Sequence, residues 1–262
     1  MTTPWQRAIR SGGRIGHAIE VHDAIGSTND RARELLDAGR PEGVAVVAEL
    51  QTAGRGRRGR TWTSPPGVNL MVSIGLRPRI AADAAREIVP AAALAAWQAC
   101  RAVTGDVWLK WPNDLVTADG AKLGGILVEV ASHAEGLRHA VLGFGLNVNW
   151  RSDDMPVELR ETATSLRELT GMPVDRVALL RELLASLEHE IAALEVGSSP
   201  VPRYRAACRT IGTTVVVDTP NGRIEGRAVD IGDDGTLAVE TDAGRVAVTS
   251  GEVRSVRARD TA

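Results

Sequence analysis

The densest chemical signal in the chain is a run of glycine and arginine between residues 54 and 62. It reads Gly-Arg-Gly-Arg-Arg-Gly-Arg-Thr-Trp and is followed by Thr-Ser-Pro-Pro-Gly. Glycine lets a backbone wrap closely around a ligand, and arginine supplies a permanently charged fork of donors that matches phosphate or carboxylate. The segment therefore predicts a flexible clamp for an anion, and the alternative is a solvated basic loop.

Two familiar phosphate-binding motifs match this segment in letters but fail in context. Gly54-x-Gly56-x-x-Gly59 satisfies the dinucleotide fingerprint, and 54–61 resembles a P-loop with Arg60 in the lysine position. Both motifs need a helix directly after the glycines, because the helix N-terminus holds the phosphate. The Thr-Trp-Thr-Ser-Pro-Pro-Gly that follows cannot form one. We therefore reject both motifs.

A second signal is Lys122, which stands at the start of the apolar run Leu-Gly-Gly-Ile-Leu-Val-Glu-Val. The run predicts a buried strand, in which Gly124 and Gly125 weaken the packing unless something must approach the backbone closely. A lysine at the mouth of such a strand suits the stabilisation of negative charge. The alternative is a surface lysine beside a hairpin turn.

Composition places these signals in an ordinary folded protein. The chain has 262 residues, 44% hydrophobic and 24% charged, with a formal net charge of -2. That balance argues against a polycation that seeks nucleic acid or anionic membrane. The two cysteines make no disulfide framework, and the five histidines show no metal-ligand spacing. Because no signal-like apolar segment is evident, we expect a protein of the reducing cytoplasm.

Hydrophobic periodicity predicts the elements that must position these residues. A long loop, 51–67, carries the arginines. Strands are expected at 15–25, 43–50, 68–76, 107–111, 122–130 and 138–149. Helices are expected at 27–38, 82–103, 175–195 and 202–208, with Pro90 as a candidate kink in the second.

The chain changes character after residue 197. Short strands are expected at 213–218, 224–231, 236–241, 245–249 and 253–256, with hairpin turns at Asn221-Gly222, Asp234-Gly235 and Ala243-Gly244. Five short strands in so few residues suggest a small β-barrel of SH3-like type. The predicted domains are a mixed α/β unit, 1–207, and a barrel, 208–262.

Several segments taken together resemble biotin protein ligases. The matching segments, in chain order, are Ser27-Thr-Asn29, 51–62, Lys110-Trp-Pro-Asn-Asp114, 122–129 and Gly143-Phe-Gly-Leu-Asn-Val-Asn149. The resemblance implies an α+β fold, with a core like that of class II aminoacyl-tRNA synthetases and a C-terminal SH3-like barrel. Phe144, the only phenylalanine in the chain, stands where the family often has a smaller residue.

The resemblance also implies a reaction in two steps. ATP and biotin first give biotinyl-5'-AMP and pyrophosphate, with Mg²⁺ required. A lysine on a biotin carboxyl carrier protein domain of a biotin-dependent carboxylase then receives the biotin. Only 26 residues precede Ser27, so we expect the monofunctional form without the N-terminal DNA-binding domain found in some members. The expected protein binds neither DNA nor membrane and is a monomer or weak homodimer.

The same resemblance assigns roles to individual residues. The catalytic group is Lys122, Arg57, Arg58 and Asp114. The biotin-binding group is Ser27, Thr28, Asn29, Gln51, Gly54, Arg55, Gly56, Arg57, Lys122, Gly124, Gly125, Gly143 and Gly145. The ATP-binding group is Arg57, Arg58, Trp62, Lys110, Asn113 and Asn147. Asp114 would orient Lys122 or hold Mg²⁺, and no set of direct metal ligands is assigned.

Some of these residues also fit a purely structural role. Ser-Thr-Asn-Asp at 27–30 is common N-cap chemistry for a helix. Pro112 and Asn113 suit a simple turn, and Trp62 suits a core position as well as a stacking platform for adenine. We expect the arginine loop to be mobile when empty and ordered over its ligand.

Two other functions stay open from the sequence. A lipoate or other acyl-carrier ligase would share the fold, the adenylate and the lysine target, although the arginine loop and Lys110–Asp114 favour biotin. A nucleic-acid-binding regulator would use the arginine loop and the barrel on phosphates. Against this regulator stand the net charge of -2 and the aromatic content of 3%, together with an acidic barrel.

Overall fold

The structure is a computed structural model that describes residues 4–133, 136–220 and 222–255. The expected turn at Asn221-Gly222 and the end of the last expected strand therefore lie partly outside the described residues. No helix within these ranges is long and apolar enough to cross a membrane.

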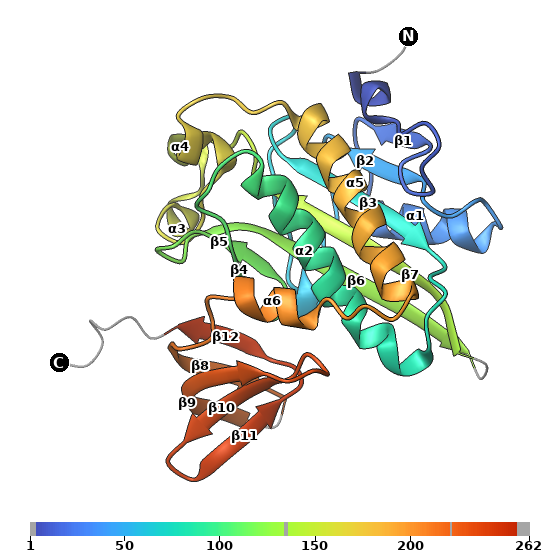
Figure 1. Ribbon diagram of the computed structural model, residues 1–262. Helices are drawn as coiled ribbons and strands as arrows, with labels where there is room; N and C mark the ends of the chain where they lie inside the picture. Colours follow the sequence, from blue (N-terminus) through green and yellow to red (C-terminus); the bar gives the residue numbers. More distant parts are fainter. Residues whose placement is uncertain (1–3, 134–135, 221, 256–262) are drawn as a thin grey trace.

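A seven-stranded sheet forms the body of the molecule (Figure 1). Its order is β1-β2-β3-β7-β6-β5-β4, in which β1 and β2 are parallel and every other pair is antiparallel. The six strands expected in this part of the chain are confirmed, and β5 is an addition that the sequence did not predict. The strands are β1 (Ile19–His22), β2 (Ala45–Ala48), β3 (Leu70–Leu76), β4 (Trp108–Lys110), β5 (Asp114–Val116), β6 (Lys122–His133) and β7 (Gly136–Leu146).

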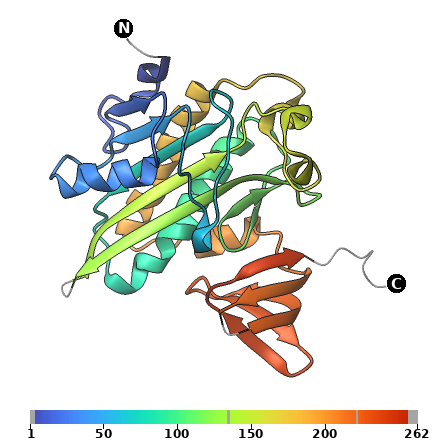
Figure 2. The same cartoon turned by 180° about the vertical axis from the view of Figure 1, so that it is seen from behind.

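Helices cover the two faces of this sheet unequally. α2 (Ile88–Arg101) and α5 (Arg176–Glu195) pack against each other over one face, which Figure 1 shows from the front. α1 (Thr28–Asp37) packs over β2, β3 and β7 on the opposite face, seen in Figure 2. Because α1 spans only part of that face, the rest is left to the loops. The remaining helices are α3 (Val157–Arg160), α4 (Leu166–Thr170) and α6 (Val201–Ala207).

The side chains of β7 show how the sheet separates a core from a site. Leu142, Phe144 and Leu146 belong to the large apolar cluster under α2 and α5. Because side chains alternate along a strand, Gly143 and Gly145 fall on the opposite face. The core face is thus filled by large apolar side chains, and the other face is left bare at the glycines.

The helix expected at 82–103 needs a correction. Residues Ala82–Glu87 form a 3₁₀ helix, and the α-helix starts at Ile88. Pro90 therefore lies in the first turn of α2, where its missing N–H leaves no hydrogen bond unmade. The expected interior position of this proline was wrong.

A second, five-stranded antiparallel sheet follows α6, with the order β11-β10-β9-β8-β12. Trp111 Nε1 donates to the carbonyl of Gly235 at 2.9 Å, and Arg205 Nε donates to the carbonyl of Ile231 at 2.7 Å, so this sheet is attached to the first. The division at residues 207 and 208 stays a prediction. The strands are β8 (Thr214–Thr219), β9 (Gly222–Ile231), β10 (Leu237–Thr241), β11 (Gly244–Val248) and β12 (Glu252–Ser255).

Candidate active site

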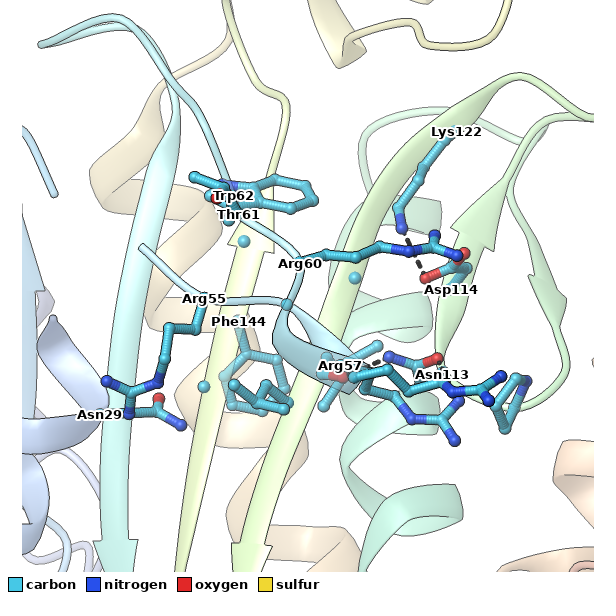
Figure 3. Close-up of a pocket in the computed structure, with 18 of the residues that line it drawn as sticks. Asn29, Arg55, Arg57, Arg60, Thr61, Trp62, Asn113, Asp114, Lys122 and Phe144 are labelled. Atoms are coloured by element: carbon cyan, nitrogen blue, oxygen red, sulfur yellow. Dashed lines mark hydrogen bonds and ion pairs between the residues drawn. The ribbon is translucent and has the colours of Figure 1, made fainter. Parts of the chain in front are cut away.

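A cavity that is open to solvent lies over the bare face of the large sheet. The register places Gly145 opposite both Gly125 and Met71, and Gly143 opposite both Leu127 and Ser73. Four small residues on three neighbouring strands, Ser73, Gly125, Gly143 and Gly145, therefore form part of its floor. Figure 3 shows Asn29 and Arg55 toward one end of the cavity, and Lys122, Asp114 and Asn113 toward the other.

The end beside α1 is neutral, polar and buried. Gln51 Oε1 accepts from the backbone N–H of Thr28 at 2.8 Å and from its hydroxyl at 3.0 Å. The Thr28 hydroxyl lies 2.7 Å from that of Ser73, which donates to Asn29 Oδ1 at 2.6 Å. Ser27 is the N-cap residue of α1, as the sequence predicts, but its side chain makes no capping hydrogen bond. This fixed array is suited to a neutral group rich in donors and acceptors.

The opposite end is cationic. Lys122 Nζ donates to Asp114 Oδ1 at 2.8 Å and lies 5.7 Å from the centre of the Trp62 ring. Arg57 donates to Asn113 Oδ1 at 3.1 Å. In the part of the chain that the structure describes, neither Arg57 nor Lys110 has a carboxylate within ion-pair distance.

Burial acts on both of these cations. Desolvation lowers the pKa of Lys110, and Lys122 and Arg60 add to that lowering while Asp114 opposes it. Desolvation likewise lowers the pKa of Arg57, although arginine stays charged in proteins. Partly buried cations without a matching carboxylate favour a ligand that brings negative charge.

Trp62 and apolar side chains connect the two ends. The indole of Trp62 lies against Gly145 so closely that a Cβ added at Gly145 would be 2.6 Å from Trp62 Cε2. Its Nε1 is buried and has no hydrogen-bond partner among the described residues. Trp62 is therefore part of the cavity wall. Leu127, on the same face of β6 as Gly125, also lines the cavity.

The arginine loop reaches across the whole cavity. No helix follows its glycines, and its only helical piece is a 3₁₀ turn at Arg57–Gly59. Arg58 has a left-handed φ of 57° and donates to the backbone carbonyl of Asp218 at 2.6 Å. Arg60 pairs with Glu252 of β12. The C-terminal sheet therefore contacts the loop and helps to close the cavity.

Three of the predicted residues do not line the cavity: Gly54, Gly124 and Asn147. A Cβ at Gly54 would lie 2.5 Å from the carbonyl of Trp62, and one at Gly124 would lie 2.7 Å from Leu146 Cδ2. Asn147 is buried, and its amide donates to the carbonyl of Lys122 at 3.5 Å. In this structure all three support the groups beside them. The predicted residues that line the cavity are Ser27, Thr28, Asn29, Gln51, Arg55, Gly56, Arg57, Arg58, Trp62, Lys110, Asn113, Asp114, Lys122, Gly125, Gly143 and Gly145.

Sequence reasoning missed several cavity residues. Ser73 left a signal, because its hydroxyl is the one polar side chain in the buried run Leu70–Leu76. Glu252 and Val253 left none, because only the packing of the second sheet brings them to the loop. The other missed residues are Arg60, Thr61, Trp111, Pro112, Ile126, Leu127, Phe144 and Gly251.

Comparison with known proteins finds two family models that match different parts of the chain. Residues 21–147 match the Biotin/lipoate A/B protein ligase family, and residues 210–254 match the Biotin protein ligase C terminal domain. A biotin–[acetyl-CoA-carboxylase] ligase of Mycobacterium tuberculosis is 36% identical over 247 residues, which cover 91% of this chain and 89% of that protein. The bifunctional ligase/repressor BirA of Bacillus subtilis is 34% identical over 242 residues, 91% of this chain and 74% of BirA.

Solved structures give the same answer. Biotin protein ligase from Aquifex aeolicus in complex with biotin and ATP superposes with a TM-score of 0.75 at 28% identity, over 92% of this chain and 99% of that one. The fold is the expected mixed α/β, class II synthetase-like core with a C-terminal SH3-like domain. Together with the geometry of the cavity, these matches show that the chain belongs to the biotin protein ligase family.

Proposed function

We propose that this chain joins biotin to ATP in its cavity and then passes the biotin to a lysine of a carrier protein. One observation carries the proposal. A single cavity joins a neutral hydrogen-bonding end to a cationic end through an apolar middle. Biotin has the same order of parts, with a neutral ureido ring, an aliphatic chain and a carboxylate. The cationic end would then receive both that carboxylate and the ATP phosphates.

In the first step a carboxylate oxygen of biotin attacks the α-phosphorus of ATP, and pyrophosphate leaves. Both reactants are anions, so positive charge must hold them together and neutralise the charge that develops in the transition state. We assign this role to Lys122, with Arg57 and Lys110 beside the phosphates. Asp114 fixes the Lys122 ammonium at 2.8 Å, which makes it a positioning residue. Ser27, Thr28, Asn29, Gln51 and Ser73 would hold the ureido ring.

In the second step the amine of a carrier lysine attacks the carbonyl carbon of biotinyl-5'-AMP. A new C–N bond forms, the bond from that carbon to the phosphate oxygen breaks, and AMP leaves. The amine loses a proton on the way to the amide. The ligases of Mycobacterium tuberculosis and Paracoccus denitrificans are named for acetyl-CoA carboxylase, which supports a carboxylase carrier domain as the acceptor.

The residues at the cationic end fit a Mg²⁺ ion that arrives with ATP. No cluster of three or more acidic, histidine or cysteine ligands occurs among the described residues. Mg²⁺ in ATP sites is bound mainly by phosphate oxygens and water, with one or two carboxylates. Asp114 would be that carboxylate, and the ion would neutralise charge on the phosphates.

The wider expectations stay part of this proposal. We expect a cytoplasmic protein that is a monomer or weak homodimer and that does not bind DNA. The net charge of -2 supports the last point, because affinity for DNA rests largely on lysine and arginine contacts to phosphate.

The test is biotin-dependent exchange of labelled pyrophosphate into ATP. The proposal expects exchange that requires biotin and that lipoate does not support. Folded protein without exchange in the presence of biotin would overturn it. Exchange with lipoate instead would identify the related acyl-carrier ligase.

The lowered pKa of Lys110 leads to a pH prediction. A lysine with a lowered pKa becomes neutral at a lower pH than usual, so its attraction for phosphate is lost earlier as the pH rises. We expect kcat/KM for ATP, which reports groups of the free enzyme, to decline through this lowered pKa. Lys110→Arg keeps its charge and should move the decline to higher pH. Identical profiles for the two proteins would remove Lys110 from the ATP site.

A further inference from the structure

Arg55 differs from the other arginines of the loop in the direction it takes. Its guanidinium points away from Lys122 and toward α1, beside Asn29 (Figure 3). Both terminal nitrogens of Arg55 donate hydrogen bonds to the carboxylate of Asp30, Nη1 to Oδ2 at 2.6 Å and Nη2 to Oδ1 at 2.8 Å. Nη2 also lies 3.4 Å from Glu129 Oε1. This two-point geometry fixes both the distance and the orientation of the loop relative to α1.

Glu129 connects this ion pair to the neutral end of the cavity. Its Oε2 accepts from Asn29 Nδ2 at 2.7 Å and from Arg33 Nη2 at 3.3 Å. Asn29 lines the cavity, and its Oδ1 accepts from the buried hydroxyl of Ser73. One carboxylate thus orients an amide of the candidate biotin site and also contacts the loop that covers the site.

The charges of this cluster balance. Arg33 Nη2 pairs with Asp30 at 2.8 Å as well as with Glu129, so two guanidinium groups face two carboxylates. The hydrogen bond from Arg55 lowers the pKa of Asp30, which keeps that carboxylate charged. Arg57, two residues farther along the loop, has no such carboxylate in the described ranges. Arg55 is therefore paired with carboxylates of the protein, whereas Arg57 is available to bind an anionic ligand.

We propose that Asp30 and Glu129 form an anionic latch that holds the arginine loop closed over biotin through Arg55. In this latch Glu129 is a positioning residue that couples closure of the loop to the orientation of Asn29. The inference rests on the proposed function, because it names what retains biotin and biotinyl-5'-AMP. The latch differs from the cationic end of the cavity, since none of its groups is assigned to the phosphates or to the reacting atoms.

The test uses Asp30→Asn and Glu129→Gln in the full chain. Both substitutions keep the shape of the side chain and remove its charge. We expect KM for biotin and the rate of biotinyl-5'-AMP release to rise about 3- to 10-fold, the range for partly exposed, charge-assisted pairs. Glu129→Gln should have the larger effect, because it also loosens Asn29. The kcat for pyrophosphate exchange should stay within about twofold, since the reacting groups are untouched.

Three comparisons separate a latch from a general loss of structure. Asp37→Asn removes a carboxylate at the other end of α1, where it pairs with Arg138 at 3.1 Å, and should leave all of these values unchanged. Asp30→Glu restores the charge and should recover part of the loss. In ~1 M salt, where the Debye length is about 3 Å, the difference between wild type and Asp30→Asn should shrink.

The rate of tryptic cleavage after Arg57, Arg58 and Arg60, identified by mass spectrometry, measures how often the loop opens and does not depend on catalysis. Without ligand, Asp30→Asn should be cut there severalfold faster than wild type and Asp37→Asn. Unchanged cleavage, biotin KM and adenylate release in both latch variants would overturn the inference. If the latch variants are cleaved faster but the wild-type protein shows no biotin-dependent exchange, the latch is retained and the proposed function is rejected.

Discussion

Lys122→Met is expected to lower kcat for biotin-dependent pyrophosphate exchange by about 10²- to 10³-fold, the cost of removing one charge-stabilising donor from an active site. The Lys122 ammonium is held by Asp114 and lies over the edge of the cavity that also holds Arg57 and Lys110. Methionine keeps most of the length and apolar character of the side chain while removing the charge. The loss should appear in kcat, because the charge that Lys122 meets is greatest in the transition state.

Two controls isolate this effect. Lys122→Arg keeps the charge but changes the geometry, so it should retain more activity than Lys122→Met. Asp114→Asn removes the carboxylate that fixes the ammonium and that would also hold Mg²⁺, so it should lower kcat as well, and raising the Mg²⁺ concentration should recover only the part that depends on the metal. The fold should survive, because the backbone N–H of Lys122 donates to the carbonyl of Thr162 whatever its side chain. Exchange within about tenfold of wild type in Lys122→Met would show that another cation carries the reaction.

Local patterns in the sequence were sufficient for most of the fold. Three local patterns each predicted an element that the structure contains. The buried run before the loop predicted β2, the apolar run after Lys122 predicted β6, and the helical periodicity of 175–195 predicted α5. β5 was not predicted, because three residues after a turn are too few to show an alternation of apolar and polar side chains. The start of α2 was misplaced because Ala82–Glu87 has the composition of a helix and only its hydrogen-bond pattern differs.

The residues of the site also fall into two groups, those that the sequence could indicate and those that it could not. The sequence alone indicates a functional role for the arginine loop, Lys122 and the paired glycines, because such residues are unfavourable in a strand or a packed loop. It does not indicate the groups that hold them. Glu252 reaches Arg60 only because the second sheet packs against the loop, and Glu129 of β6 reaches Arg55 only because the loop folds back over the large sheet. Contacts between distant segments depend on the tertiary arrangement, which no local pattern contains.

Gly143 gives the second large effect, and here the expected loss is in binding. A Cβ at Gly143 would lie 2.1 Å from Asn29 Oδ1 and 3.0 Å from its Cγ. Asn29 cannot easily move, because Ser73 and Glu129 hold its two amide atoms. Gly143→Ala must therefore break these bonds. The displaced amide is then no longer oriented toward biotin, so we expect KM for biotin to rise on the order of 10- to 100-fold, which corresponds to about 1.4–2.7 kcal/mol of binding free energy. KM for ATP should change little.

The reason for this loss can be tested directly. Gly105→Ala, which meets no heavy atom within 4 Å, is the matched control and should bind biotin as wild type does. Asn29→Ala by itself should weaken biotin binding, because it removes an amide from the neutral end. On that background Gly143→Ala no longer meets the Asn29 oxygen, so its further effect should fall to a few-fold, a large departure from additivity. If the two losses simply add, the glycine serves the floor of the cavity in some way other than making room for Asn29.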